Sequence, residues 1–272
     1  MIHALLIYDR PRLARNQWFA QTFQKKCSRR GWHLQLKLAE EMDLSKLEYL
    51  PDAVFMRCLR PQMSRYLETL GVRVFNSAAV SKITNDKLET FHFFRRLGIP
   101  VMESRELDFR TLLPFPFVLK TVDGHGGSEV FLVNSETELQ TFIRQAEHPT
   151  SRRWLIQRLA DTPGRDVRVY VVGNQIIAAM ERTSQTDFRS NYSLGGSAKF
   201  YALNSEEKAL VSQIISFLPL DFAGVDLIFH QNQPVLNEIE DVVGTRMLYS
   251  ETEIDILEIF LDYAEKEILR RK

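Results

Sequence analysis

Two apolar runs, 224–228 and 234–240, carry carboxylates at positions that restrict how this part of the chain can fold. Asp226 lies in the first run, and Glu238 and Glu240 lie in the second. If residues 230–233 form a turn, period-2 geometry places Glu238 and Glu240 on one face of a hairpin, within reach of Asp226. Three crowded carboxylates repel one another unless a cation lies between them, and Mg²⁺ or Mn²⁺ suits such oxygen ligands. A solvated acidic edge strand is the alternative interpretation, because edge strands often carry charge.

The bulk composition excludes several classes of protein. The 272 residues suffice for roughly two domains, and 35 Lys and Arg balance 35 Asp and Glu. Zero formal net charge argues against a protein that holds nucleic acid or an anionic membrane by bulk electrostatics. Cys27 and Cys58 indicate reduced thiols in a cytoplasmic protein, and the N-terminus resembles a strand more than a signal peptide. We expect a cytoplasmic protein without nucleic-acid or membrane partners, and leave homo-oligomerisation open.

The first 75 residues alternate between apolar strands and amphipathic helices. Strands are expected over 2–8, 33–38, 52–58 and 72–75, with helices over 12–30 and 63–70. This order predicts a parallel α/β sheet, whose ligands gather at the carboxyl ends of its strands. Those ends carry Arg57, Arg60 and Asn76, which we expect to face a carboxylate-bearing substrate.

The rest of the chain predicts a mixed α+β arrangement. Further strands are expected over 114–120, 129–133, 154–159, 166–172 and 175–182, and helices over 86–97, 135–145, 205–217 and from Glu253. The segment Gly173-Asn174 is expected to turn a hairpin between the strands 166–172 and 175–182.

A glycine-rich turn, residues 123–128, follows the strand that ends at Lys120. Glycine lets the backbone present N–H groups to phosphate oxygens, and Lys120 supplies a positive charge. His125 is the one histidine in this turn. The turn is neither a Walker A loop nor a Rossmann fingerprint, because no Gly-Lys-Ser/Thr ends it and no helix follows directly. A flexible hairpin tip is the alternative interpretation.

Two further arginines occur in segments suited to anion binding. Arg189 lies in Phe188-Arg189-Ser190-Asn191, which leads to Gly195-Gly196, a composition that fits a loop around phosphate or a developing oxyanion. Ordinary surface loops share this composition. Arg246 follows the second carboxylate run and is placed to clamp a phosphate or a substrate carboxylate, with a solvated arginine as the alternative.

The order of these motifs resembles that of the ATP-grasp carboxylate–amine ligases, most closely the RimK-like branch of the ribosomal protein S6 glutamate ligase and the LysX-type ligases. The resemblance covers almost the whole chain. It is carried by Asn85-Asp86-Lys87, the Lys120 strand and its glycine turn, Gln157-Arg158-Leu159, 164–173, the Phe-Arg-Ser-Asn loop with its glycine pair, and the carboxylate hairpin. It implies an N-terminal pre-ATP-grasp α/β domain over 1–82, followed by two α+β subdomains that clasp ATP, a lid over 83–155 and a metal-binding subdomain over 156–272.

The resemblance also implies roles for individual residues. Metal ligands would be Asp226, Glu238 and Glu240, holding two Mg²⁺ (or Mn²⁺) ions, and Arg189 and Arg246 would be catalytic. Nucleotide contacts would come from Lys87, Lys120, Gly124, His125, Gly126, Gly127, Gln157, Arg158, Leu159, Asp166, Arg168, Arg189, Ser190 and Asn191.

The implied reaction joins a carboxylate to an amine at the expense of ATP. The carboxylate attacks the γ-phosphate to give an acyl phosphate, and an amine then displaces phosphate to give an amide. The substrates are expected to be an amino acid and a small-molecule, peptide or protein acceptor. Two alternatives stay open: a nucleotide-binding regulatory or partner protein that has lost ligation, and an enzyme that phosphorylates without ligating.

Three departures from the family pattern bear on specificity. The family usually has Glu-x-Asn on the last metal strand, where this chain has Glu238-Ile239-Glu240. The usually acidic hinge position is Arg158 here, and the stretch 241–246 differs from the usual Asn-Ala-Ser-Pro-Gly run. We therefore expect a more acidic metal site and a substrate outside the well-known ones.

Overall fold

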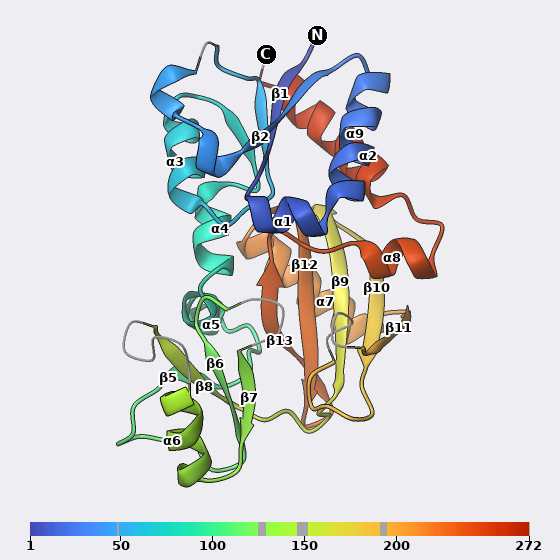
Figure 1. Ribbon diagram of the computed structural model, residues 1–272. Coiled ribbons are helices and arrows are strands. Elements are labelled where there is room, and N and C mark those ends of the chain that lie inside the picture. Colours follow the sequence, from blue (N-terminus) through green and yellow to red (C-terminus); the bar gives the residue numbers. More distant parts are fainter. Residues whose placement is uncertain (48, 125–128, 146–151, 191–194, 272) are drawn as a thin grey trace.

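The N-terminal part of the chain forms a parallel sheet, as predicted. In the computed structural model, which describes residues 1–47, 49–124, 129–145, 152–190 and 195–271, its strand order is β2-β1-β3-β4 (Figure 1). The strands and their connecting helices are β1 (His3–Tyr8), α1 (Arg10–Arg15), α2 (Gln17–Arg29), β2 (His33–Leu38), β3 (Ala53–Met56), α3 (Pro61–Thr69), β4 (Arg73–Phe75) and α4 (Ala78–Thr84).

The expected helix over 12–30 is wrong as a single helix, because α1 and α2 are separate. Asn16 lies between them with φ −129°, its N–H donates to the carbonyl of Leu13, and its Nδ2 donates to the carbonyl of Arg12. These bonds satisfy the last turn of α1, and α2 begins at the next residue.

A second, antiparallel sheet forms the centre of the molecule, with strand order β11-β10-β9-β12-β13. Its strands are β9 (Arg165–Gly173), β10 (Gln175–Thr183), β11 (Ser197–Phe200), β12 (Leu220–His230) and β13 (Gln233–Glu240). The helices α5 (Lys87–Arg96) and α7 (Ser205–Phe217) cover one face, where Phe94, Leu210 and Val169 of β9 belong to one apolar cluster. Asn204 and Glu207 form a capping box that fixes the start of α7.

A third, smaller sheet has the order β5-β8-β6-β7 and lies beside the edge of the central sheet formed by β13 (Figure 1). It contains β5 (Ser104–Glu106), β6 (Phe117–Thr121), β7 (Val130–Val133) and β8 (Trp154–Arg158), with α6 (Glu136–Gln145) on one side. The division at residues 82 and 155 stays a prediction, and this sheet itself extends to Arg158. Among the described residues, no helix combines the length and apolar character needed to cross a bilayer.

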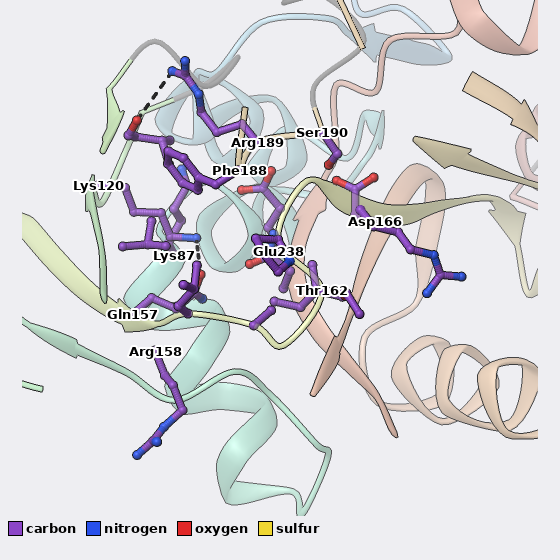
Figure 2. A pocket seen from close by; sticks show the side chains of 18 of the residues that line it. Lys87, Lys120, Gln157, Arg158, Thr162, Asp166, Phe188, Arg189, Ser190 and Glu238 are labelled. Atoms are coloured by element: carbon purple, nitrogen blue, oxygen red, sulfur yellow. Dashed lines mark hydrogen bonds between the residues drawn. The ribbon is translucent and has the colours of Figure 1, made fainter. Parts of the chain in front are cut away.

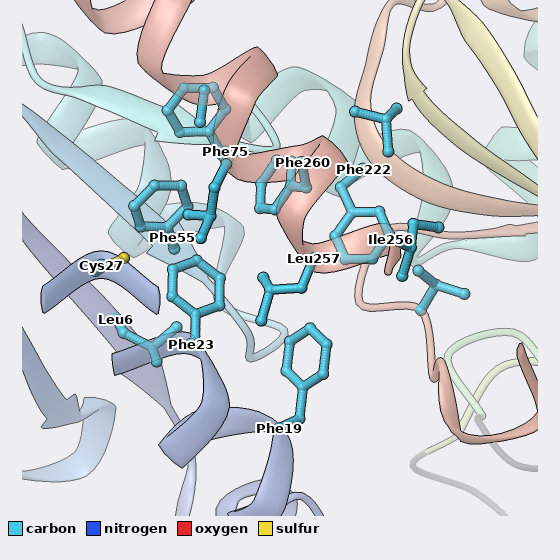
Figure 3. Packing of buried hydrophobic residues seen from close by; sticks show 14 of the residues in the cluster. Leu6, Phe19, Phe23, Cys27, Phe55, Phe75, Phe222, Ile256, Leu257 and Phe260 are labelled. Atoms are coloured by element: carbon cyan, nitrogen blue, oxygen red, sulfur yellow. The ribbon is translucent and has the colours of Figure 1, made fainter. Parts of the chain in front are cut away.

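An aromatic cluster joins the N-terminal sheet to the central sheet. Helix α9 (Ile256–Leu269) lies beside α2, and α8 (Arg246–Glu251) precedes it (Figure 1). Figure 3 shows Phe260 of α9 among Phe23, Phe55, Phe75 and Phe222, with ring centroids 4.8 Å apart for Phe222 and Phe260. Such pairs contribute about 0.5–1.5 kcal/mol each beyond their burial. The two sheets therefore form one packed body, which we call the platform.

The face of the central sheet that meets α9 changes character along its strands. Tyr170 and Val172 of β9 belong to the aromatic cluster, while Asp166 and Arg168 lie further back along the same strand. Residues two apart on a strand point to the same face. One end of this face is therefore apolar and covered by α9, and the other end carries buried charges.

Asn76 fastens the N-terminal sheet to the central sheet through four hydrogen bonds. Its Oδ1 accepts from the backbone N–H groups of Asp221 (2.7 Å) and Phe222 (3.1 Å). Its Nδ2 donates to the carbonyls of Phe222 (2.8 Å) and Asp241 (3.0 Å). The side chain is buried, so all its hydrogen-bonding capacity serves the backbone at the start of β12 and the end of β13.

We predict that Asn76→Ala destabilises the protein by about 3–5 kcal/mol, because it leaves four buried backbone groups without their partner. The change is measured as the free energy of unfolding in urea. Asn174→Ala, at an exposed turn, is the matched control and should shift that free energy by less than about 0.5 kcal/mol. Equal stability of the two variants would contradict the assignment.

Candidate functional site

A tight turn and a β-bulge shape the carboxylate hairpin. The two turn residues 231–232 have φ of 52° and 60°, as two-residue hairpin turns require. Uninterrupted pairing from this turn would place Asp226 opposite Asn237, with Glu238 on the other face of the sheet. The register instead shifts by one residue between Asp226 and the next position, so that Asp226 pairs with Glu238. The bulge at Asn237 is therefore what brings the carboxylates together.

The three carboxylates form one group with different surroundings. Oxygen atoms of Asp226, Glu238 and Glu240 lie within 4.8 Å of one another. Glu238 and Glu240 line a cavity that is described below, whereas Asp226 is buried and does not line it. Among the residues that the structure describes, none donates a hydrogen bond to the carboxylate of Glu238. The group fits a divalent cation best on the side of the cavity, where carboxylate oxygens are accessible.

Two buried arginines hold Asp226. Arg168 donates from Nε and Nη2 to its two oxygens (2.7 and 2.6 Å), and Arg182 donates from Nη2 (2.7 Å). Arg182 also forms a bidentate pair with Asp166 (2.6 and 2.7 Å). Burial alone would raise the pKa of Asp226, but the two guanidinium charges outweigh it and lower the pKa to about 2. Asp226 is therefore ionised under all ordinary conditions.

The cavity that Lys120 and Glu238 line lies between the central sheet and the third sheet (Figure 2). It measures about 820 Å³ including its open mouth, within the range of small-molecule sites. Eleven of the predicted site residues line it: Lys87, Lys120, Gly124, Gln157, Arg158, Leu159, Asp166, Arg189, Ser190, Glu238 and Glu240. The apolar walls, Val118, Val130, Phe188 and Ile228, were not predicted as site residues, although Val118 and Ile228 lie on the two strands that carry Lys120 and Asp226.

Lys120 is held by a chain of hydrogen bonds that leads to the backbone. Its Nζ donates to Oε1 of Gln157 (3.0 Å), and Nε2 of Gln157 donates to Oγ of Ser104 (3.0 Å). Ser104 donates in turn to the carbonyl of Met102, which fixes the orientation of the amide. Burial lowers the pKa of Lys120 to about 8, although the negative charge of Glu238 opposes the shift. The ammonium thus points into the cavity from β6.

The loop before β11 carries Arg189 and is pinned at Gly164. Gly164 has φ +74°, and its N–H and carbonyl bond to Phe188 and Ser184 (2.7 and 2.8 Å). A Cβ at this position would lie 2.6 Å from the Ser184 carbonyl oxygen, so only glycine fits without a shift. The Arg189 guanidinium bonds to Asp187 (2.6 Å) and reaches the Val130 carbonyl on β7 (3.5 Å). This loop therefore touches the third sheet across the cavity.

Several predicted residues lie away from the cavity. Arg246 is exposed at the start of α8, and Arg168 lies beneath the cavity with Asp226. Arg158 does line the cavity, but its guanidinium bonds to Glu103 (2.9 and 3.0 Å) and is directed away from Lys120 and Glu238 in Figure 2. The predicted residues His125, Gly126, Gly127 and Asn191 lie outside the described residues.

The expectation for the carboxyl ends of the N-terminal strands needs correction at Arg57 and Asn76, whereas Arg60 is exposed and its role stays a prediction. The amide group of Asn76 is fully occupied by hydrogen bonds to the backbone. Arg57 is buried, and its Nη2 donates to the Val243 carbonyl (2.7 Å). Both side chains join the N-terminal sheet to β12 or to the segment that follows β13, and are used within the platform. Besides the apolar walls, the sequence reasoning missed Arg182, which holds Asp226, and Ser104, which holds Gln157.

Comparison with known proteins identifies the fold. The structure superposes on D-alanine–D-alanine ligase from Bacillus anthracis with a TM-score of 0.78, over 99% of this chain and 98% of that one at 15% identity. The RimK domain ATP-grasp protein from Sphaerobacter thermophilus gives 0.74 at 19% identity, covering 96% and 98%. The ATP-grasp ligase PsnB, solved with a minimal precursor, Mg and ADP, gives 0.67 at 18%, covering 96% of each chain. The predicted fold class is confirmed.

Curated relatives carry the names of ligases and synthases. The probable alpha-L-glutamate ligase 2 of Hahella chejuensis is 30% identical over 75% of this chain and 70% of its own length. A probable alpha-L-glutamate ligase of Parasynechococcus marenigrum is 29% identical over 80% of this chain, and human N-acetylaspartylglutamate synthase A is 31% identical over 86%. The chain spans 48% and 63% of the lengths of these two relatives.

The resemblance to ATP-grasp ligases is thereby confirmed. The family model for the RimK-like ATP-grasp domain matches residues 101–263, which include β6 with Lys120, the Arg189 loop and the carboxylate hairpin. This chain belongs to the RimK-like ATP-grasp ligase family.

Proposed function

We propose that this protein is an ATP-dependent carboxylate–amine ligase that forms an amide bond through an acyl phosphate. The observation that carries the proposal is the distribution of charge across one cavity. Lys87, Lys120 and Arg189 lie to one side of Glu238 in Figure 2, and Glu240 also lines the cavity. A triphosphate with a divalent cation matches this arrangement, because the phosphates need the cations and the ion needs the carboxylates.

The nucleotide would lie between the third sheet and the platform. The backbone of 157–159 and the apolar walls Val118 and Ile228 suit a flat base, and Asp166 lies at a suitable edge for ribose hydroxyls. Lys87 and Lys120 would contact the phosphates, as would Arg189 and Ser190. The carboxylates of Asp226, Glu238 and Glu240 would bind the divalent metal, and we propose two Mg²⁺ or Mn²⁺ ions.

The protein's part in the reaction would be alignment and charge neutralisation. Phosphoryl transfer needs little covalent help, and the bound ion would neutralise charge that develops on the transferred group. Arg189 would contact the transferred phosphoryl group. Lys120 would hold the adjacent phosphate of the nucleotide in line with it. The third sheet would act as a lid that excludes water, because an acyl phosphate hydrolyses readily.

The substrates are proposed by class only. The names of the relatives support an amino acid as one reactant, with a small-molecule, peptide or protein acceptor as the other. Arg246 remains our proposal for a contact to a substrate carboxylate, because it is exposed and follows the carboxylate strand closely. Cys27 and Cys58 are buried free thiols, which supports the proposal of a cytoplasmic site of action.

We predict that Glu238→Gln abolishes ATP turnover and leaves the fold intact. The substitution removes a negative charge that faces the cavity, and no described residue donates a hydrogen bond to this carboxylate. Turnover is measured as ADP release, with amino-acid and peptide pairs screened by mass spectrometry for a new amide. Loss of about 10²-fold or more is expected.

The exposed Glu253→Gln is the matched control for this variant and should turn over ATP like the wild type. ADP release without an amide product would favour phosphorylation alone. Nucleotide binding without substrate-stimulated ADP release would favour a regulatory protein. Wild-type turnover by Glu238→Gln would remove the metal assignment.

We predict that nucleotide affinity falls as the pH rises through about 8, because burial lowers the pKa of Lys120 to about 8. Phosphate binds the charged ammonium, so above that pH binding requires proton uptake, and the affinity declines by up to about tenfold per pH unit. Titration calorimetry with a non-hydrolysable ATP analogue from about pH 7 to about pH 9.5 measures both effects.

Lys120→Arg stays protonated throughout this range and should bind with a flatter pH profile. The same slope in the wild type and in Lys120→Arg would show that another group is responsible.

A further inference from the structure

The tripeptide Asp-Phe-Arg occurs twice in the chain, at 108–110 and at 187–189. Both copies form the same local contact, in which the aspartate accepts hydrogen bonds from the backbone N–H and from the guanidinium of the arginine two residues later. The first copy lies on an exposed turn, whereas the second contributes Arg189 to the cavity. The first copy therefore shows what the motif does in the absence of a site.

The two ion pairs differ in length and in exposure. In the first copy, the guanidinium of Arg110 lies 3.1 and 3.2 Å from the oxygens of Asp108, and the arginine side chain is 88% exposed. In the second copy, Nη2 of Arg189 lies 2.6 Å from Oδ2 of Asp187, and the arginine side chain is 25% exposed. Water screens an exposed pair almost completely and a partly buried pair much less. The same motif thus holds its arginine more firmly at the cavity.

The backbone of the second copy is fixed by residues outside the motif. Oγ of Ser184 accepts a hydrogen bond from the N–H of Asp187 (3.0 Å), and the N–H of Gly164 donates to the carbonyl of Phe188 (2.7 Å). A Cβ on Gly164 would lie 2.8 Å from the carbonyl oxygen of Asp187, so the loop is closely packed here. The carboxylate of Asp187 therefore offers Arg189 a partner in a fixed place.

The ion pair uses one edge of the Arg189 guanidinium. Nε donates to both oxygens of Asp187 (3.0 and 3.1 Å) and Nη2 to one of them, which together form the side edge. Nη1, on the end edge, reaches across the cavity to the carbonyl of Val130 (3.5 Å). Arg189 lines the cavity and Asp187 does not. Because the guanidinium carries five donors in a planar fork, it can bond a carboxylate on its side edge and a phosphate on its end edge.

We propose that Asp187 is a positioning residue that holds the side edge of Arg189 and thereby presents the end edge to the γ-phosphate of the nucleotide. This inference rests on the proposed function, which assigns Arg189 to the transferred phosphoryl group. Ordering a long side chain costs conformational entropy, and Asp187 meets that cost before the nucleotide binds. Asp187 acts through Arg189 and needs no contact with the ligand.

The test measures the affinities of AMP-PNP and ADP for the full chain with Mg²⁺ by titration calorimetry. Asp187→Asn keeps an acceptor for the backbone N–H of Arg189 and removes the charged pair. Its affinity for AMP-PNP should fall about threefold to tenfold. Its affinity for ADP, which has no γ-phosphate, should stay within about twofold of wild type, whereas a merely structural role would weaken both. Asp108→Asn, at the first copy of the motif, is the matched control and should leave both affinities unchanged.

A double-mutant cycle tests whether Asp187 acts through Arg189. Arg189→Gln should lower AMP-PNP affinity by at least about tenfold, and Asp187→Asn should cause no further loss in that background. A further loss, or tighter AMP-PNP binding by Asp187→Asn alone, would overturn the inference. A loss in Arg189→Gln with none in Asp187→Asn would overturn the inference and leave the proposed function intact. Equal AMP-PNP affinity of the wild type and Arg189→Gln would overturn the proposed role of Arg189.

A crystal structure of the wild type with Mg²⁺ and AMP-PNP gives a readout that does not depend on the folding of any variant. Nε and Nη2 of Arg189 should remain on Asp187 while Nη1 contacts the γ-phosphate. Separation of Arg189 from Asp187 in this complex would overturn the inference alone. Failure of the wild type to bind AMP-PNP with Mg²⁺ would overturn the proposed function together with the inference.

Discussion

The bidentate ion pair between Arg168 and Asp226 is the constraint on which the rest of the site depends. It joins β9 to β12 at directly opposed positions, in the middle of the five-stranded sheet. Burying such charges is costly, and it is tolerated here because Arg182 and Glu240 complete the pairing on either side. An internal charge that must stay paired permits few alternative registers, so the chain of ion pairs also fixes where Glu238 and Glu240 face the cavity.

The platform and the third sheet differ in how firmly they are held. The platform combines the aromatic cluster around Phe260 with the four hydrogen bonds of Asn76, both of which span the N-terminal and central sheets. The third sheet has its own small apolar cluster around Phe117 and Leu139, and meets the cavity from the other side. Elements with few shared buried contacts move most readily. A rigid carboxylate platform and a separately packed sheet suit a site that closes around its ligand.

The sequence predicted the elements of the site better than their register. The parallel N-terminal sheet and the cavity lining from Lys120 to Glu240 follow from periodicity, glycine positions and the order of the motifs. The two bulges that set the pairings of Arg182 and Asp226 do not follow from these features. Counting back from the turn of the β9–β10 hairpin places Arg182 opposite Arg165, and a bulge near Ile177 shifts it to Asp166. The bulge at Asn237 does the same for Glu238. One extra residue in a strand moves every side chain beyond it to the opposite face of the sheet. The pairings of Arg182 with Asp166 and of Asp226 with Glu238 therefore depend on bulges that have no local sequence signal.

The cations at the cavity make contacts to backbone carbonyls that a phosphate would replace. Lys87 donates to the carbonyl of Gly124, and Arg189 reaches the carbonyl of Val130, both in the segment that forms the third sheet and its turn. Hydrogen bonds to a charged phosphate are roughly twice as strong as those to a neutral carbonyl. A triphosphate would therefore take over these donors and lie directly between the third sheet and the platform. The position of the third sheet is in this way coupled to the ligand through the same side chains that would neutralise its charge.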